Sequence, residues 1–456
     1  MKKKSYEIDM LSGPLGPKIL RFTLPLMASS MLQLMFNAAD VIVVGKFAGD
    51  ASLAAVTSTG SLINLLVNLF MGFSIGANVV VAQAIGHGDA DRTARAVHTS
   101  ILLSLVSGVF LAAFGALTAP RLLRLMSSPE NVIGLSSLYL RIYFLGMPGM
   151  LCYNFGSALL RAGGDTQRPL RFLTIAGVVN VILNLVLVIV FHLDVAGVAI
   201  ATTLSQYISA ALVLRCLMGE SGPLRLDWKR LRFDRDVLAN IVRVGLPAGF
   251  QGIVFSLSNV VIQSSINSFG DTVMAGSGAS GNIEGFVYVG MNSFYQACLT
   301  FVSQNYGAGK CDRCDRSLLW CQGYVIAAGI LLGGLANLFG NQLLNIYTDN
   351  PDVMAQGLLR LRFVALPYFL CGIMDVMVGA LRGLGWSVAP MIVSMVGACG
   401  LRLLWIATVF QIHRVPWMLY ISYPITWIIT AGVHIICFLV IRKKAYAKVR
   451  KAEAPV

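Results

Sequence analysis

The sequence predicts an all-α integral membrane protein with twelve transmembrane helices in two parallel six-helix repeats. Three observations support this prediction: the composition, the spacing of apolar runs, and an internal repeat. Of the 456 residues, 56% are hydrophobic and only 12% are charged, whereas a soluble domain carries about 25% charged residues. This composition excludes a soluble enzyme, a disordered chain and a fibrous protein.

Apolar runs recur along the whole chain at lengths that suit a bilayer. A hydrocarbon core about 30 Å thick needs roughly 20 apolar residues per helix. No polar stretch between the runs is long enough to form a soluble domain. The predicted spans are 18–45, 52–80, 97–118, 136–160, 170–191, 195–218, 240–264, 274–304, 317–339, 357–381, 388–411 and 416–441.

The basic residues predict the orientation of these spans. If the N-terminus is cytoplasmic, most of the 35 lysines and arginines fall on the cytoplasmic side, as the positive-inside rule requires. We therefore expect a multi-pass protein of the cytoplasmic membrane with both termini in the cytoplasm. The net charge of +14 then reflects topology rather than nucleic-acid binding. The N-terminal segment lacks a cleavable signal and is expected to be an uncleaved leader.

The two halves of the chain align with each other at an offset of about 221 residues. The strongest match joins Gln-x-x-Gly-x-Gly-x-x-Asp-Arg-x-x-Arg at 83–95 to the same pattern at 304–316. Leu-Pro and Leu-Arg-x-x-Gly also recur, at 24–25 and 246–247 and at 160–164 and 381–385. We expect an N-lobe over 1–218, a linker over 219–239 and a C-lobe over 240–456. Such repeats suit alternating access, although duplication could also serve only to build a stable bundle.

These repeated motifs, together with Asn-Ala-Ala-Asp ending at Asp40, resemble the multidrug and toxic compound extrusion (MATE) family. The resemblance covers nearly the whole chain. It implies a twelve-helix antiporter that exports organic cations and other amphipathic small molecules against H⁺ or Na⁺. Because the repeat supplies its own central interface, we expect a monomer among membrane lipids. We expect neither a cofactor nor an enzymatic activity.

Asp40 is the first carboxylate inside a predicted span. A charge at the bilayer centre costs about 2.5–3.5 kcal/mol even on the most lenient scale, so it calls for a functional explanation. Asn37 and Gln33 share its helix face. We expect this stripe to face the N-lobe, where Asp40 could exchange a proton or bind Na⁺. The alternative is a solvated carboxylate near the end of its helix.

Further oxygen and amide groups are expected near Asp40. Asn180 and Asn184 share one face of the fifth span, while Tyr139 and Thr202 begin the fourth and sixth spans. The family resemblance implies that such positions surround the carboxylate of the first helix. Asn184 stands where many family members carry aspartate, which removes one anionic ligand and weakens a Na⁺ assignment. The alternative role for these side chains is hydrogen bonding between helices.

The C-lobe carries a different set of polar residues. A predicted stripe on the eighth span combines a carboxylate with aromatic and amide groups, which suits a bulky organic cation. Arg402 is predicted to be the one clear intramembrane cation, either functional or in a buried ion pair with an acidic side chain. Three carboxylates against this single cation favour a cationic cargo. The candidate residues are Glu284, Tyr288, Asn292, Tyr295 or Gln296, Asp375 and Arg402.

No motif predicts catalysis or a bound cofactor. Gly276-x-Gly278-x-x-Gly281 matches a dinucleotide fingerprint only by letter, because no strand precedes it. Cys311-x-x-Cys314 has no second pair, so a metal site is not expected beyond Na⁺ at Asp40. Two alternatives to an antiporter remain: a flippase for lipid-linked or polysaccharide precursors, and an intramembrane enzyme or receptor.

Overall fold

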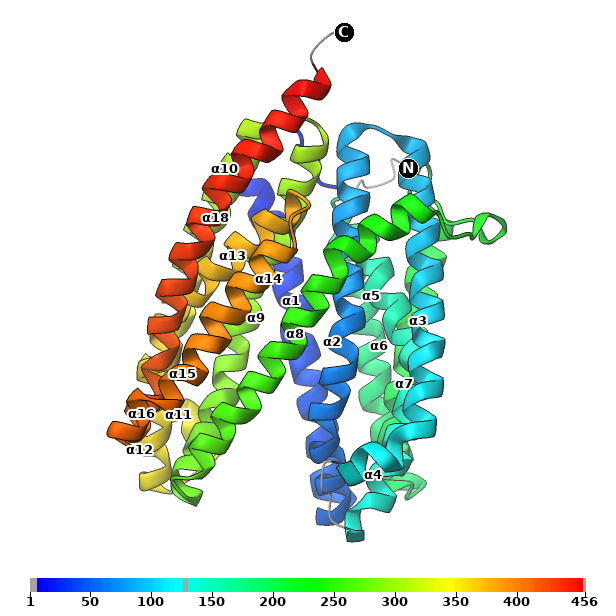
Figure 1. Cartoon of the computed structure of the whole chain (residues 1–456). Helices are drawn as coiled ribbons and strands as arrows, with labels where there is room; N and C mark the ends of the chain where they lie inside the picture. The colour runs from blue at the N-terminus through cyan, green and yellow to red at the C-terminus, as the bar shows by residue number, and fades with distance from the viewer. Residues whose placement is uncertain (1–5, 126–129, 454–456) are drawn as a thin grey trace. The chain divides into compact units, whose positions relative to one another are not determined.

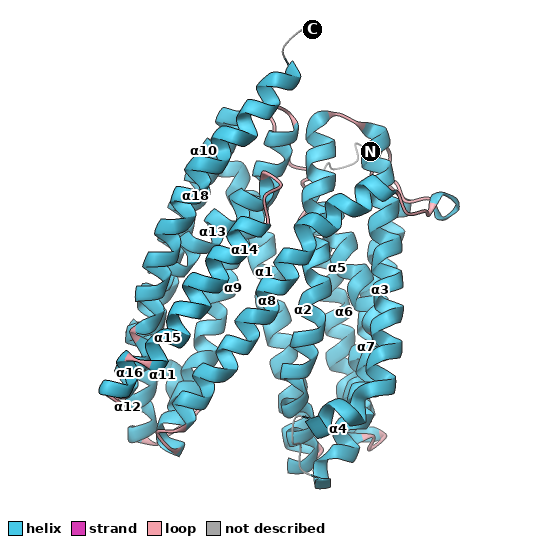
Figure 2. Ribbon diagram, viewed as in Figure 1, coloured by secondary structure: helices cyan, strands magenta, loops and turns pink. Residues whose placement is uncertain are grey.

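The computed structural model describes residues 6–125 and 130–453, and this part of the chain is helical with no strand (Figure 2). The basic residues Lys2 to Lys4, which contribute to the predicted orientation, lie outside the described residues. Each of the twelve predicted runs coincides with a helix or with a short succession of helices (Figure 1). The predicted fold class is therefore confirmed.

The first six runs become seven α-helices. Short loops join them, as expected for consecutive membrane crossings. The helices are α1 (Leu15–Phe47), α2 (Asp50–His87), α3 (Ala90–Leu125), α4 (Glu130–Leu145), α5 (Met147–Ala162), α6 (Gln167–Leu185), which a π-helical turn extends over Val186–Val190, and α7 (Asp194–Met218).

The last six runs are interrupted more often. The long helices are α8 (Arg235–Asn267), α9 (Asp271–Gly307), α10 (Cys311–Leu338) and α18 (Ser422–Glu453). Between them lie α11 (Gly340–Asn345), α12 (Pro351–Arg360), α13 (Phe369–Gly383), α14 (Val388–Ser394), α15 (Leu401–Ala407), α16 (Val409–Ile412) and α17 (Pro416–Tyr420). A π-helical turn at Leu361–Ala365 continues α12 in the direction of α13. A second π-helical turn, at Met395–Gly400, joins α14 to α15.

Ten of the described helical segments are long and apolar enough to cross a membrane, and a bent pair supplies an eleventh. Helix α9 has the length of a span but is not one of these, because serine, asparagine, glutamine and glutamate interrupt its apolar sequence. A helix this polar is tolerated in lipid only where protein or a water-filled cavity covers its polar face.

The bent pair corrects the predicted fourth span. The sequence predicts one helix over 136–160, whereas α4 and α5 meet at a 45° bend around Gly146. Pro148 lies in the first turn of α5, where its missing N–H leaves no hydrogen bond unmade. Because α4 begins at Glu130, Tyr139 lies in mid-helix rather than at its start. Thr202 likewise lies about two turns into α7.

The chain packs into two compact units whose limits differ from the predicted lobe boundaries. One unit contains Ala28–Gly249 and the segment up to Asp9, and the other contains Met10–Met27 and the chain from Phe250 onward. One limit lies before α1, between Asp9 and Met10, and the other two fall inside α1 and α8 rather than in the linker. The two limits inside helices each follow a proline by two residues, at Pro25 and Pro247, so both keep the register of the internal repeat.

The repeated glycine-rich motif holds the segment that precedes the first helix of a repeat. In the second unit, Arg313 donates to the carbonyls of Met10, Ser12 and Gly13 at 3.0–3.1 Å. In the first unit, Arg95 of the motif donates to the carboxylate of Asp234 at 3.0 Å, just before α8. The shared sequence therefore serves a shared task, the anchoring of a leader segment.

Helices α2 and α8 approach closely in the first unit through paired glycines. Gly72 and Gly76 on α2 face Gly245 and Gly249 on α8, both at a spacing of four residues. A Cβ on Gly245 would lie 2.7 Å from the Cα of Phe73, and one on Gly76 would overlap the carbonyl of Ile241. This is the small-residue packing that brings membrane helices together.

We expect Gly76→Ala to destabilise the protein by about 1–3 kcal/mol, because the new methyl group has no room against the α8 backbone. Gly60→Ala on the same helix is the matched control, since a Cβ there meets open space. Thermal unfolding of the purified protein, followed by tryptophan fluorescence, measures both. Equal unfolding midpoints for the two variants would contradict the close contact.

Candidate functional site

Asp40 lies inside α1, seven residues before the helix ends at Phe47. Its side chain is half-buried in the first unit. Asp40 therefore lies within the helix rather than in a turn at its end, and part of its side chain is accessible. The helix holds this acidic group within the membrane-spanning segment.

A chain of hydrogen bonds from α6 and α7 surrounds the carboxylate. Asn184 donates through Nδ2 to one oxygen of Asp40, and the Thr202 hydroxyl donates to the other oxygen at 3.3 Å. Asn180 donates to Thr202 Oγ1 at 3.4 Å. Asn180 and Asn184 are both buried. The structure thus brings together four of the residues that the sequence singled out.

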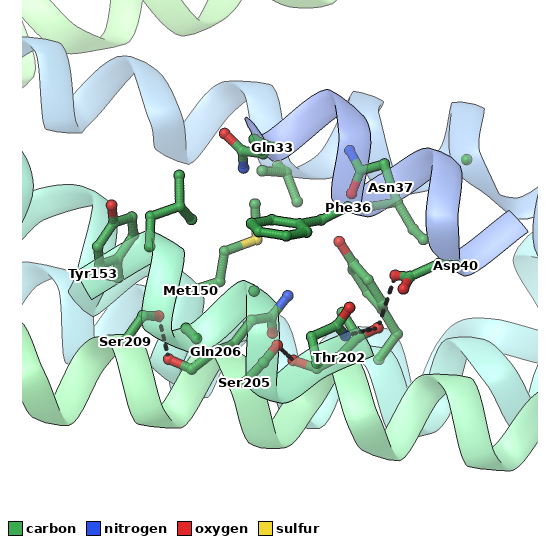
Figure 3. A pocket seen from close by; sticks show the side chains of 18 of the residues that line it. Gln33, Phe36, Asn37, Asp40, Met150, Tyr153, Thr202, Ser205, Gln206 and Ser209 are labelled. Atoms are coloured by element: carbon green, nitrogen blue, oxygen red, sulfur yellow. Dashed lines mark hydrogen bonds between the residues drawn. The ribbon is translucent and has the colours of Figure 1, made fainter. Parts of the chain in front are cut away.

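These groups line a cavity of about 370 Å³ in the first unit. Figure 3 shows Asp40, Asn37 and Gln33 along α1 on one side, with Thr202, Ser205, Gln206 and Ser209 from α7 on the other. Tyr139 of α4 also lines the cavity and stacks on Tyr143 at 5.8 Å between ring centroids. The cavity therefore combines a carboxylate, amides, hydroxyls and aromatic rings.

Several lining residues were not identified from the sequence. A helical spacing could have revealed them, because Thr202, Ser205 or Gln206, and Ser209 repeat at three- to four-residue intervals along α7. Tyr143 likewise follows Tyr139 by one turn of α4. The further polar residues that line the cavity are Asn64, Tyr143, Tyr153, Asn154, Ser205, Gln206 and Ser209.

No basic side chain within the described residues forms an ion pair with Asp40, and none lines the cavity. Hydrogen-bond donors alone stabilise the negative charge. The buried Oδ1 of Asn184 has no hydrogen-bond partner in the described part of the chain. A proton on Asp40, or a small cation among these oxygen atoms, would complete the electrostatic balance.

In the second unit, Glu284 is not a free carboxylate. Arg360 of α12 donates to both of its oxygens at 2.8 Å and also to Ser277 at 2.5 Å. Glu284 is buried, and the side chain of Arg360 is 12% exposed. This bidentate pair corrects the prediction that Arg402 is the one clear cation inside the membrane. The sequence could have revealed this ion pair, because Arg360 lies within a predicted span and an arginine there requires a partner.

Arg402 is buried but forms no ion pair with a carboxylate among the described residues. It donates to Thr426 at 3.2 Å and lies 4.0 Å from the ring centroid of Tyr423. The expected buried ion pair at Arg402 is therefore wrong. The aromatic face of Tyr423 stabilises the cation instead.

The remaining candidates of the second unit differ in exposure. Asp375 on α13 is half-buried and has no ion pair or hydrogen bond to another described side chain. Tyr288 is 39% exposed and accepts a hydrogen bond from Asn292 at 3.3 Å. Tyr295 is buried and accepts a hydrogen bond from Arg382 at 2.7 Å. The predicted stripe on α9 is thus divided between interior and accessible positions.

We expect Arg360→Gln to destabilise the protein by about 3–5 kcal/mol, because Glu284 would then be buried without a counter-charge. The double variant Glu284→Gln/Arg360→Gln should recover most of this loss. Arg362→Gln is the matched control, since Arg362 is exposed on the turn that follows α12. Thermal unfolding provides the measurement, and a double variant no more stable than Arg360→Gln would contradict the expectation.

Comparison with known proteins places this arrangement in a family. The sequence model of the MatE family matches residues 25–186 and 247–407, one match in each repeat. The probable multidrug resistance protein YoeA of Bacillus subtilis is 28% identical over 391 residues, which are 84% of each chain. The FAD transporter of Shewanella oneidensis is 25% identical and covers 76% of this chain and 77% of its own.

A solved structure shares the fold over the full length. It shows a multidrug resistance MATE family transporter of the MOP superfamily in an outward-facing conformation. It superimposes with a TM-score of 0.89 at 20% identity and covers 99% of this chain and 100% of its own. At this identity the likeness concerns the fold.

Proposed function

The chain belongs to the MatE family, and on that basis we propose that it is a secondary active efflux transporter. It exports organic cations and other amphipathic small molecules in exchange for H⁺ or Na⁺. The observation that carries the proposal is Asp40, a carboxylate within a membrane span that faces a polar cavity and lacks a counter-charge among the described residues. It needs neither a cofactor nor a catalytic group.

The coupling ion occupies the Asp40 network in this proposal. A proton neutralises the carboxylate directly, while Na⁺ takes oxygen ligands from Asp40, Asn180, Asn184 and Thr202, with Tyr139 close by. Either ion changes the charge of the cavity by one unit. When the ion enters from outside, the transporter can therefore lose its bound organic cation. When the ion is released to the cytoplasm, the transporter can bind the next one.

The two compact units supply the conformational change. Helices α1 and α8 are each divided between the two units, and the two points of division follow Pro25 and Pro247. Because proline removes a helix hydrogen bond, these are points at which a helix can bend. We place the transporter as a monomer in the cytoplasmic membrane with both termini in the cytoplasm.

The cargo site of the second unit centres on Asp375. Its carboxylate has no ion pair among the described residues, and the accessible ring of Tyr288 with Asn292 offers an aromatic and polar surface to a cation. Glu284 with Arg360, and Arg402 with Tyr423, lie in the same unit and hold its helices in position.

The flippase alternative requires a cavity that attracts anionic headgroups. The cavity at Asp40 contains one acidic side chain and no basic one. The negative charge of this cavity disfavours phosphate-bearing molecules, including flavin nucleotides, in the first unit.

We expect Asp40→Asn to abolish gradient-driven efflux, because the amide can neither release a proton nor attract Na⁺. The measurement is transport of ethidium in inverted vesicles with an imposed pH or Na⁺ gradient, which also identifies the coupling ion. Asp194→Asn, at the exposed start of α7, is the control and should transport normally. Normal ethidium transport by the Asp40 variant would contradict the proposal.

We expect Asn184→Asp to strengthen Na⁺ binding by about ten-fold or more, because a second carboxylate would lie beside Asp40. Na⁺-dependent protection against thermal unfolding measures the change. Asn184→Ala is the control, since it removes the amide without adding charge. Equal Na⁺ dependence in the two variants would argue against cation binding by this network.

A further inference from the structure

The loop before α8 forms a second cavity, separate from the one at Asp40. Residues 229–234 lie against the first two turns of α3 and enclose about 540 Å³ within the first unit. In Figure 1 the green loop that links α7 to α8 projects at the right edge of the picture, beside α3. Neither the coupling ion nor the cargo site of the proposed transport function uses this cavity.

The loop is fixed to α3 by specific hydrogen bonds. Thr99 donates to the carbonyl of Arg232 at 3.4 Å and accepts from the N–H of Asp234 at 3.1 Å. The N–H of Asp227 donates to Nε2 of His98 at 3.1 Å, and the other ring nitrogen of His98 lies 2.6 Å from the carbonyl of Ala94. With both ring nitrogens engaged, His98 joins the loop to α3, so the cavity is a formed feature of the unit.

The cavity has an excess of positive charge. Its acidic residues are already occupied, because Asp234 pairs with Arg95 at 3.0 Å and Asp91 with the same arginine at 3.2 Å. The hydrogen bond from the Val237 N–H, together with Arg95, holds the pKa of Asp234 below its usual range, so this pairing persists at neutral pH.

Three cations of the lining remain available. Lys229 and Arg232 have no ion pair within the described residues, and Arg230 has only a contact of 4.0 Å with Asp227, which does not line the cavity. All three side chains are exposed. Guanidinium groups bind phosphate oxygens in pairs, and a neighbouring ammonium adds a third donor.

The cavity lies at the level where a membrane begins. Its α3 residues, 91–98, directly precede the apolar run predicted from residue 97, and its other wall leads into α8. Two large aromatic side chains flank the cations, Trp228 at 47% and Phe233 at 42% exposure. Exposed aromatic residues next to cations at a span end are typical of contact with lipid headgroups and the adjacent acyl chains.

We propose that this cavity binds the phosphate of an anionic phospholipid, with Lys229, Arg230 and Arg232 around the headgroup and Trp228 and Phe233 against the upper acyl chains. Such a lipid would fasten the segment between the two repeats to the membrane surface. The proposal depends on the insertion of α3 and α8 in a membrane but not on transport, so the two can fail independently.

The test uses the full-length protein in phosphatidylcholine nanodiscs that contain a photoactivatable phosphatidylglycerol. After illumination, mass spectrometry maps the labelled peptides. We expect label in 90–99 and 228–235, and a decrease of at least ten-fold in the variant Lys229→Gln/Arg230→Gln/Arg232→Gln, since each interfacial cation contributes about five-fold. Labelling of these peptides that is unchanged in the variant would overturn the proposal.

Two controls separate a built site from general charge attraction. The variant Lys443→Gln/Lys444→Gln/Lys448→Gln removes equal charge from α18 and should retain the label. Thr99→Val keeps every charge but removes both hydrogen bonds to the loop, and it should reduce labelling by at least roughly five-fold, the effect of losing one of the two. A charge-matched control that loses as much label as the loop variant would overturn the proposal.

Competition identifies the source of the phosphate. Phosphatidylglycerol without the photoactive group should displace the label, whereas inorganic phosphate at the same concentration should not, because the acyl chains contribute to binding at Trp228 and Phe233. Equal displacement by inorganic phosphate would assign the cavity to a soluble anion and overturn the lipid proposal. Thermal unfolding of each variant confirms that its fold is retained.

Discussion

A hydrocarbon bilayer offers no hydrogen-bond partner, and this constraint governs where polar groups lie in the structure. Each polar or charged side chain in a span must find its partner within the protein or face a cavity that admits water or a ligand. Arg360 and Glu284 meet the requirement with each other, and Arg402 meets it with Thr426 and the ring of Tyr423. Asp40 meets it only with neutral donors at the wall of a cavity.

This difference separates structural from functional groups. A bidentate ion pair in a low-dielectric interior holds two helices in one geometry and would lose several kcal/mol if opened. A carboxylate held by an amide and a hydroxyl can change its charge while its neighbours stay in place. The two units therefore share a scaffold but assign different work to their buried charges.

Much of the fold follows from the sequence, because span length and the positions of repeated motifs are local properties. All twelve predicted runs coincide with helices. The break at Gly146 was missed, since hydropathy averages over Pro148. The partner of Glu284 was also missed, because Arg360 lies 76 residues away in the chain and only the fold brings the two together.

The site at Asp40 was predicted from a mixture of sources. The helix face of Asn37 and Gln33 follows from spacing alone, whereas the grouping of Asn180, Asn184, Tyr139 and Thr202 around the carboxylate came from the family resemblance. The structure brings the last four near Asp40 and adds Tyr143, Gln206 and Ser209 to the cavity. To predict these three residues, one must know how α4 and α7 face each other, and a single sequence does not contain that information.

The exchange of half-helices between the two units has a consequence for biosynthesis. The ribosome releases Met10–Met27 long before the rest of the unit to which they belong, and the first unit lacks its last half-helix until Gly249 has been made. Neither unit can therefore be completed from one repeat alone. A half-length ancestor with this arrangement would have had to associate with a second copy and exchange these segments, so covalent fusion of the two copies turned an obligatory dimer into a single chain.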